Sequence, residues 1–245
     1  MSYEIPKQVR DEGVELLTMN HELKIVQTAD GSNTIFNSEV GENYHSRHGA
    51  LQESRHVFVE SGLKHFLSTN KNDNVSILEV GFGTGLNFLL SADYCTAENI
   101  QLDYTGIEAY PLTTDMTSQT GYNEYVTPAL WDTFIHNYPK ALQQEVNLNP
   151  KCQLQIAHCK LLDFQSDKQY DVIYFDAFAA LYQPEMWDDA AITHTLKFLK
   201  PGGVFVTYAI TGNLKRTIKG LGLKVEKAPG APGKREMLRA TRTGI

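Results

Sequence analysis

The stretch ILEVGFGTGLNFL, residues 77–89, decides the fold of this 245-residue chain. An apolar run is followed by Gly81, Gly83 and Gly85 and then by a second apolar run, a pattern that predicts a buried strand, a tight turn and a helix. Glycine allows positive φ angles and close approach of a ligand to the main chain, and the helix offers unpaired N–H groups at its start. The stretch therefore predicts either a ligand-binding turn or a purely structural one.

The spacing of the glycines separates several kinds of nucleotide site. The dinucleotide fingerprint GxGxxG would need its third glycine at Leu86, and no Gly-Lys-Ser/Thr of a phosphate-binding P-loop follows. The observed GxGxG is the form found in S-adenosylmethionine (SAM) sites, where the glycines accommodate an amino acid and a ribose. The candidate cofactor contacts in this stretch are Glu79, Gly81, Phe82, Gly83, Gly85 and Asn87.

An acidic residue at the end of the next predicted strand is a further candidate cofactor contact. The predicted strand LDYTGIEA, residues 102–109, ends at Glu108. A carboxylate at this position in nucleotide-binding folds accepts hydrogen bonds from the ribose hydroxyls, and the alternative is a strand-end residue that faces solvent. Glu79 lies inside the preceding strand, where it could hold the loop or meet the methionine end of SAM.

From residue 75 onward, apolar strand-like runs alternate with helical segments. Near-continuous Val, Ile, Leu and Phe in the strands predicts a parallel sheet covered by helices on both faces. Two closing runs without an intervening helix, 223–228 and 235–241, predict a hairpin with an antiparallel strand. The expected fold class is α/β, a Rossmann-like class I SAM-dependent methyltransferase. The long segment 111–150 predicts an extra helix or two beside the substrate pocket.

Residues 1–74 are expected to form a small β/α extension. Polar and apolar residues alternate over 14–40 around ADGSN (29–33), which predicts a β-hairpin or short meander because Asp-Gly is a strong turn signal. Apolar residues at helical spacing follow up to Leu67, and STNKNDN (68–74) reads as a loop. We place the boundary there, with the methyltransferase domain over 75–245.

Asp176 is the candidate catalytic residue. It is the acidic residue of YFDAFAALYQPEMW (174–187) that directly ends an apolar strand, before the chain turns through Pro184. Ligands of open parallel sheets bind outside the carboxyl ends of the strands, so Asp176 is expected beside the crevice. A helix-capping role is less favoured, because the next helix is predicted to begin only near Pro184.

Composition excludes several classes of protein. No apolar run reaches the roughly 18 residues of a membrane span, and the N-terminus has no signal-peptide core. The three cysteines form no CxxC pair and no His cluster has zinc spacing, which predicts a cytoplasmic protein without a metal site.

Charge is divided unevenly along the chain. The net charge is −7, yet the segment from Lys197 onward holds eleven Lys or Arg and only two acidic residues. A basic C-terminal quarter can bind a polyanion such as RNA, and a solvated basic surface is the alternative.

Five ordered blocks resemble one family. They are YHSRHGALQESRHVF (44–58), GFGTGLNFL (81–89), FDAFAALYQPEMW (175–187), LKPGGVFVTY (199–208) and GKREML (233–238). Together they resemble the methyltransferase domain of the bacterial bifunctional enzyme of tRNA 5-methylaminomethyl-2-thiouridine biosynthesis, the MnmC family. Ala177 and Ala180 stand where the family usually has Gly and Pro. His158 and Cys159 replace its Gly-Asp pair, which leaves Asp163 as a substitute adenine contact.

The resemblance implies an activity and a set of roles. It implies methyl transfer from SAM to the amine of 5-aminomethyl-(2-thio)uridine at the wobble position, with Asp176 orienting the amine and taking its proton. We expect a stand-alone form without the family's oxidase domain, and an oxidase or an aminomethyl-forming enzyme as a possible partner. Phe178, Tyr182 and Trp187 are candidates for stacking on the uracil, against ordinary core packing.

The remaining candidates are basic residues that could contact phosphates, and one pair of opposite charge. Lys215, Arg216, Lys234 and Arg235 are candidate phosphate contacts in the anticodon region of tRNA, although one of the last two should point inward because strand residues alternate faces. Glu53 and Arg55 could close over the cofactor or form a structural ion pair.

Three rival functions stay open on the sequence. A polyamine aminopropyltransferase shares the fold and a catalytic aspartate, although its small polycationic substrate suits a basic C-terminal quarter poorly. A nicotinamide-dependent oxidoreductase lacks support because the third glycine is missing. A non-catalytic RNA-binding protein with a decayed site is disfavoured by the presence of Asp176, Glu108 and all three glycines.

Overall fold

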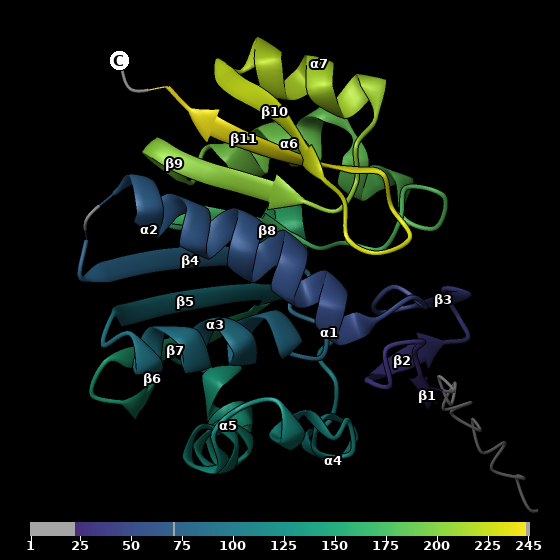
Figure 1. The fold of residues 1–245 in the computed structure, drawn as a ribbon, viewed down its shortest axis with the longest axis vertical. Helices are drawn as coiled ribbons and strands as arrows, with labels where there is room; N and C mark the ends of the chain where they lie inside the picture. Colours follow the sequence, from purple (N-terminus) through teal and green to yellow (C-terminus); the bar gives the residue numbers. More distant parts are fainter. Residues whose placement is uncertain (1–22, 71, 244–245) are drawn as a thin grey trace, which may run out of the picture.

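A computed structural model describes residues 23–70 and 72–243 of the chain, and the part of the predicted hairpin over 14–22 lies outside these residues. Its centre is an eight-stranded sheet of order β10-β11-β9-β8-β4-β5-β7-β6 (Figure 1). The strands are β4 (Asn74–Val80), β5 (Gln101–Glu108), β6 (Val146–Asn149), β7 (Cys152–His158), β8 (Tyr170–Phe175), β9 (Leu199–Thr207), β10 (Leu223–Pro229) and β11 (Glu236–Arg242).

The strand directions confirm the expected class I arrangement. The five central strands from β9 to β7 are parallel, whereas β11 lies between β9 and β10 and runs antiparallel to both. A short edge strand, β6, pairs antiparallel with β7. The chain order reverses between β4 and β8, so the carboxyl ends of these two strands form the switch point where ligands bind in such sheets.

Helices cover both faces of the sheet, because alternate strand residues enter two separate hydrophobic cores. Ile77 and Tyr174 pack with one set of helices, whereas Leu78 and Phe175 pack with the other. The first set is η1 (Ser54–Lys64), α3 (Leu86–Ala97) and α5 (Pro128–Ala141). The second set includes α6 (Asp189–Leu196) and α7 (Gly212–Gly220).

The predicted extra helices in the segment 111–150 are present. They are α4 (Thr114–Ser118), the 3₁₀ turn η2 (Tyr122–Glu124) and α5. Two further 3₁₀ turns, η3 (Leu161–Asp163) and η4 (Pro184–Trp187), follow β7 and β8. Helix η4 begins at Pro184, eight residues after Asp176, so Asp176 does not cap it.

The N-terminal part consists of a small sheet and one long helical segment. Strands β1 (Leu23–Gln27), β2 (Asn33–Asn37) and β3 (Glu42–Asn43) form antiparallel pairs, which confirms a hairpin around ADGSN. The helical segment runs through α1 (Ala50–Glu53), the π-helix η1 (Ser54–Lys64) and α2 (His65–Thr69). It lies along the sheet (Figure 1), and Val57, Phe58 and Leu63 are fully buried in the same core as β8 and β9.

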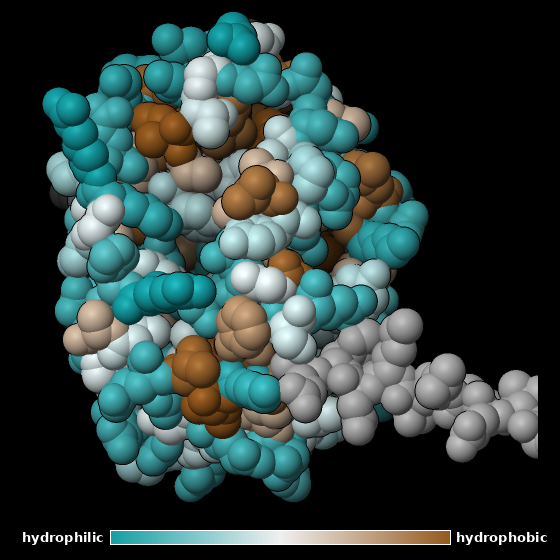
Figure 2. Space-filling model, turned by 90° about the vertical axis from the view of Figure 1, so that its right-hand side faces the viewer, coloured by the Kyte–Doolittle hydropathy of each residue, from teal (hydrophilic) through white to brown (hydrophobic). Residues whose placement is uncertain are grey.

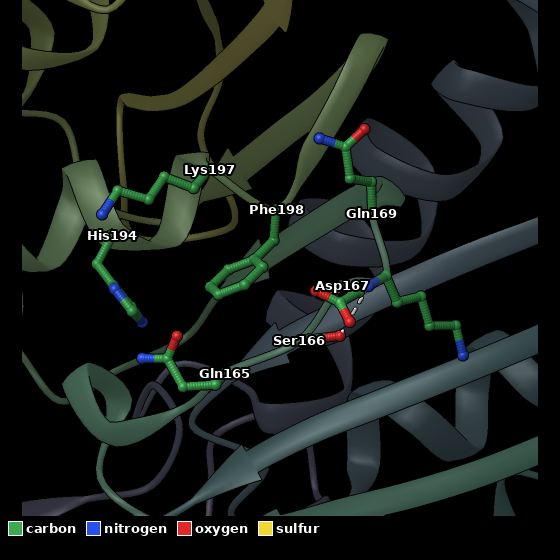
Figure 3. Close-up of a pocket in the computed structure, with 8 residues that line it drawn as sticks. Gln165, Ser166, Asp167, Gln169, His194, Lys197 and Phe198 are labelled. Carbon is green, nitrogen blue, oxygen red and sulfur yellow. Dashed lines mark hydrogen bonds between the residues drawn. The ribbon is translucent and has the colours of Figure 1, made fainter.

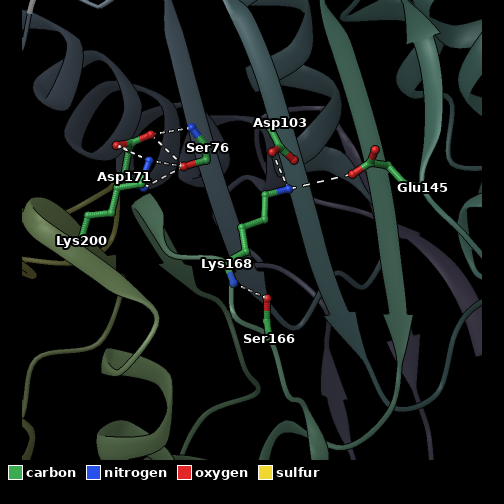
Figure 4. A network of polar contacts seen from close by, with 7 residues as sticks. All are labelled: Ser76, Asp103, Glu145, Ser166, Lys168, Asp171 and Lys200. Carbon is green, nitrogen blue, oxygen red and sulfur yellow. Dashed lines mark hydrogen bonds and ion pairs between the residues drawn. The ribbon is translucent and has the colours of Figure 1, made fainter.

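A polar network fastens the amino ends of the strands, at the end of the sheet away from the switch point (Figure 4). The carboxylate of Asp171 accepts hydrogen bonds from the main-chain N–H and hydroxyl of Ser76, at 2.8 and 2.7 Å, and pairs with Lys200 at 3.0 Å. Lys168 pairs with Asp103 of β5 and lies 3.9 Å from Glu145. The contacts of Asp171 thus join β8 to both of its neighbours, β4 and β9, at their amino ends.

Within the described residues, no helix combines the length and the apolar character that crossing a membrane requires.

Candidate active site

A cavity of about 1650 Å³ opens at the carboxyl ends of the parallel strands. Its walls come from the glycine turn, the end of β5, the segment after β7, the segment after β8, and the small N-terminal sheet. Figure 2 shows the side of the molecule toward which these strand ends point, with separate hydrophobic patches between hydrophilic side chains. The cavity therefore lies at the switch point that the sheet order predicts.

The glycine turn has the conformation that its sequence requires. Gly81, Gly83 and Gly85 have φ angles of 85°, 52° and 78°, which residues other than glycine rarely adopt. A Cβ atom on Gly81 would lie 2.5 Å from the carbonyl oxygen of Asp176. The absence of a side chain at Gly81 thus lets the end of β8 approach the turn and brings the predicted catalytic residue beside the predicted cofactor loop.

Glu108 is joined to the glycine turn. Its carboxylate accepts hydrogen bonds from the main-chain N–H groups of Gly83 at 2.8 Å and Tyr110 at 3.0 Å. Removal from water raises the pKa of Glu108, and these main-chain hydrogen bonds oppose the rise. Glu108 also lines the cavity, where the remaining lone pairs of its oxygens can accept hydroxyl groups of a ligand.

Asn87 connects two carboxyl groups. Its side-chain amide donates to Glu79 Oε1 and to Asp176 Oδ2, both at 2.8 Å, and the hydroxyl of Tyr104 donates to Glu79 Oε2 at 2.8 Å. Glu79 is fully buried, and desolvation raises its pKa well above the ordinary value. Glu79 is therefore held inside the protein behind Asn87, and it fixes the amide that positions Asp176.

The buried oxygen Oδ1 of Asn87 has no hydrogen-bond partner among the described residues. Asn87 lines the cavity, so an ammonium or hydroxyl group of a ligand could satisfy this acceptor. Together with the glycine turn and Glu108, this free acceptor fits a ligand that carries an amino acid group and a ribose.

Asp176 itself is half-buried at the cavity wall, and its main-chain N–H donates to the carbonyl of Val80 at 2.9 Å. Desolvation raises the pKa of Asp176 to about 8, with a smaller rise from the charge of Glu53. The amide of Asn87 and the charge of Lys234 lower it in part. This carboxyl group is therefore a much stronger base than an ordinary aspartate.

The aromatic candidates fall into two groups. Phe178 and Tyr182 line the cavity, and the ring of Phe178 packs edge-on against Tyr44 with centroids 5.0 Å apart. The prediction of Trp187 as a stacking residue is corrected: its ring packs in the core against Phe175 and Tyr208, and its Nε1–H donates to the carbonyl of Phe178 at 2.7 Å. Trp187 therefore supports the loop that carries Phe178.

Phe82 lines the cavity, as a cofactor contact at this residue requires. Its side chain is 2% exposed and packs in the core against Phe88 and Tyr104, with centroid distances of 6.2 and 6.5 Å. The cofactor contact at Phe82 stays a prediction, and the burial of the ring favours a contact through the main chain. The sequence did not predict the direction of this ring, because residues within a turn follow no fixed alternation of faces.

The basic candidates also differ in their surroundings. Lys234 points inward and pairs with Glu53 at 2.7 Å, which corrects its assignment as a phosphate contact and confirms that one residue of the Lys234–Arg235 pair faces the protein. Arg235 and Arg216 are exposed and Lys215 is half-buried, and none of these three forms an ion pair with another described residue. Arg55 is exposed and is not the partner of Glu53.

The segment after β7 borders the far side of the cavity. His158, Cys159 and the exposed Asp163 all line it, and His158 lies close enough to lower the pKa of Glu108 slightly by its charge. Asp163 thus stands on the wall where a substitute adenine contact is expected.

Two lining residues, Tyr44 and His45, were not among the sequence candidates. A Cβ atom on Gly83 would lie 2.9 Å from Cδ1 of Tyr44, so the tyrosine ring lies directly against the turn. His45 is buried between Thr34 and Thr84, with ring nitrogens 3.0 and 3.4 Å from the two hydroxyl groups. Burial lowers the pKa of His45 to about 4, so it joins the N-terminal sheet to the turn as a neutral group. Both residues belong to the family-like block 44–58, which was the sequence signal that could have identified them.

A second pocket is small and lies at the other end of β8 (Figure 3). It encloses about 320 Å³ between residues 165–169 and the C-terminal end of α6. His194 packs against the ring of Phe198, with centroids 5.3 Å apart, and its Nε2 lies 3.0 Å from the carbonyl of Phe164. None of the candidate residues from the sequence lines this pocket.

Comparisons with known proteins agree with this geometry. Residues 126–243 match the model of a family described as S-adenosyl-L-methionine-dependent methyltransferase. The chain is 30% identical over 211 residues to the tRNA 5-methylaminomethyl-2-thiouridine biosynthesis bifunctional protein MnmC of Marinobacter nauticus, and 29% identical over 214 residues to that of Methylobacillus flagellatus. These matches cover 81% and 83% of this chain, which spans about a third of the length of each relative.

The fold is similar to that of a solved structure. The crystal structure of MNMC2 from Aquifex aeolicus superposes with a TM-score of 0.75 at 21% identity, covering 93% of this chain and 73% of the other. Residues 126–243 thus match the S-adenosyl-L-methionine-dependent methyltransferase family, and most of the chain is similar to one part of the MnmC bifunctional proteins.

Proposed function

We propose that this protein transfers a methyl group from SAM to the primary amine of 5-aminomethyl-(2-thio)uridine at the wobble position of tRNA. The observation that carries the proposal is the placement of Asp176, which faces the cavity and is tied through Asn87 to the strand and helix that flank the glycine turn. The similarity to the MnmC proteins suggests the substrate, and the structure has a carboxyl group beside a cavity large enough for a nucleotide.

The residues that would hold SAM come from three strand ends. The turn over Gly81, Gly83 and Gly85 leaves room for the methionine part, and the unpartnered Oδ1 of Asn87 suits its ammonium group. Glu108 would accept the ribose hydroxyls, and Asp163 lies on the wall expected for the adenine. When bound, SAM supplies an electrophilic methyl group on a sulfonium sulfur.

Asp176 would act on the amine. An alkylamine resembles lysine, with a pKa of about 10.4, and therefore arrives mostly protonated. The ionised carboxylate of Asp176 would take one proton from the ammonium group, which frees the nitrogen lone pair for the methyl group. Because burial raises the pKa of Asp176 to about 8, this proton transfer costs less than it would for an ordinary aspartate.

The rim of the cavity supports recognition of a nucleobase. Of five large apolar side chains that are exposed among the described residues, Tyr110, Leu162, Leu181 and Tyr182 line this cavity. Leu181 is 84% exposed and belongs to the segment that carries Asp176 and Phe178. Flat, unstacked bases of an RNA loop pack on such side chains, so the rim suits nucleotides beside the one that enters the cavity.

The basic residues would serve the rest of the tRNA. Exposed cations on α7 and in the β10–β11 connection, Arg216 and Arg235, together with Lys215, are available for phosphate contacts near the anticodon. A tRNA substrate implies a cytoplasmic enzyme that acts after the reaction that installs the aminomethyl group. A partner oxidase or aminomethyl-forming enzyme would supply that substrate.

One assay tests the proposal. The protein is incubated with methyl-labelled SAM and tRNA that carries 5-aminomethyl-2-thiouridine, and the nucleosides are identified by mass spectrometry. We expect label in 5-methylaminomethyl-2-thiouridine, and none in tRNA with an unmodified wobble uridine. Asp176→Asn should reduce turnover at least about 100-fold while SAM affinity changes little.

A parallel reaction examines the rival function. Decarboxylated SAM and a diamine are offered to the same preparation. Transfer of an aminopropyl group, without methylation of the aminomethyl tRNA, would overturn the proposed function.

A further inference from the structure

A partly buried ion pair lies beside the catalytic candidate and joins two distant parts of the chain. Lys234, in the connection between β10 and β11, pairs with Glu53 of α1 at 2.7 Å. The other carboxyl oxygen of Glu53 accepts the main-chain N–H of Ser46 at 2.8 Å. The side chain of Glu53 is only 7% exposed, so it is held in the protein rather than in solvent.

The same lysine reaches the main chain beside Asp176 through Tyr208. The Lys234 ammonium lies 3.8 Å from the centroid of the Tyr208 ring, at the end of β9. The hydroxyl of Tyr208 donates to the carbonyl of Ala177 at 2.9 Å. Ala177 follows Asp176 directly, so contacts run from Lys234 to the main chain next to the carboxyl group.

The two members of the pair also act on the charge of Asp176 in opposite directions. Glu53 raises the pKa of Asp176 by its negative charge, and Lys234 lowers it. The other groups that face Asp176 are the buried Glu79 and Tyr104 behind Asn87, and Tyr208 on the side of β9. None of these three groups carries a positive charge, so Lys234 is the group that offsets the charge of Glu53.

We propose that the Glu53–Lys234 ion pair is a positioning device for Asp176, which fixes the loop after β8 and balances the charge beside the carboxyl group. This inference rests on the proposed function. Neither residue lines the cavity, so neither is expected to touch the substrate. The pair instead acts through Asp176, and its two members act in opposite directions.

The test is a double-mutant cycle with two readouts. Lys234→Met leaves Glu53 uncompensated, so the pH at which Asp176 is half-ionised should rise by about half a unit or more. Glu53→Gln should shift it in the opposite direction, and the double variant should return close to the original value. The acid limb of the kcat profile should move in the same way, and Lys234→Met should lower kcat at pH 7 by about threefold or more.

A matched control comes from the same hairpin. Lys227→Met removes an exposed ion pair with Glu236, 3.3 Å long, between β10 and β11. It should leave both readouts unchanged. Lys234→Arg keeps the positive charge and should preserve the original profile, whereas a merely structural role would be disturbed by both substitutions at Lys234.

The two readouts separate failure of this inference from failure of the proposed function. Carbon-13 NMR of the Asp176 carboxyl group follows its titration in the free protein and requires no turnover. Absence of methyl transfer by the unaltered protein would overturn the function, whatever the titrations show. Shifts of equal sign in the two single variants, or no shift in either folded variant, would overturn the positioning role.

Discussion

The main-chain N–H of Gly83 donates a 2.8 Å hydrogen bond to the carboxylate of Glu108. This contact joins the centre of the glycine turn to the end of the neighbouring strand, so the loop and the predicted ribose acceptor form one unit. A change in the acid therefore alters both the ligand contact and the conformation of the turn.

Glu108→Gln should weaken SAM binding about tenfold or more. The substitution removes a charged acceptor, whose hydrogen bonds contribute about 1.5–3 kcal/mol each. Isothermal titration calorimetry with SAM measures the effect. Glu98→Gln, at an exposed position after α3, is the matched control and should leave the dissociation constant unchanged. Equal affinity in the Glu108 variant would contradict the ribose assignment.

Asp176→Asn should stabilise the protein progressively as the pH rises. The folded-state pKa of Asp176 is about 8 and its ordinary value is 3.8, so the carboxyl group favours folding while it is protonated. That contribution is complete below about pH 4 and is lost as the pH rises through about 8. Melting temperatures of the two proteins should therefore be similar at pH 4 and should differ, in favour of the variant, at pH 8.

The expected gain at pH 8 is roughly 1–3 kcal/mol in the free energy of unfolding, less than the full shift because the cavity admits water. Asp163→Asn offers a comparison, because this exposed carboxyl group borders the same cavity. A difference between the Asp176 variant and the original protein that stays constant with pH would show that Asp176 titrates normally.

Changes at the apolar rim should affect the RNA substrate and leave SAM binding intact. Leu181→Ser and Tyr182→Ala remove exposed surface on which unstacked bases can pack, and each should raise KM for tRNA about tenfold. Leu221→Ser is the control, because Leu221 is exposed but lies outside the cavity. An unchanged KM in both rim variants would indicate that tRNA approaches from another side.

Trp187→Ala should lower stability, by about 3–5 kcal/mol, because it empties a core position. Trp187→Phe keeps most of the packing but removes the hydrogen bond to the Phe178 carbonyl, which should cost about 1 kcal/mol. Chemical denaturation measures both values. If Trp187→Phe instead left stability unchanged and raised KM for tRNA alone, the indole would contact the base after all.

Local sequence signals were sufficient to predict the glycine turn, the parallel sheet, and the positions of Glu108 and Asp176 at strand ends. Gly81, Glu108 and Asp176 each stand next to a strand end, and parallel strands bring such positions together whatever the details of packing. The directions of Phe82 and Trp187 could not be obtained in this way, because each depends on which core lies beneath a turn. The inward direction of Lys234 could not be predicted for a similar reason, since its partner Glu53 lies 181 residues away in the chain.

Tyr44 and His45 show a different limit. Their block was visible in the sequence, yet their position against Gly83 and Thr84 depends on how the N-terminal sheet docks on the turn. No periodic pattern within 44–58 specifies that docking. The structure was needed to assign them to the cavity.

This arrangement has a consequence for any attempt to divide the protein. Tyr44 and His45 precede the predicted domain boundary at residue 74, whereas the turn that they cover follows it. Two fragments separated at that boundary would each carry part of one binding surface. Fragment complementation would then report on assembly directly. Neither fragment alone should bind SAM, and mixing the two fragments should restore SAM binding.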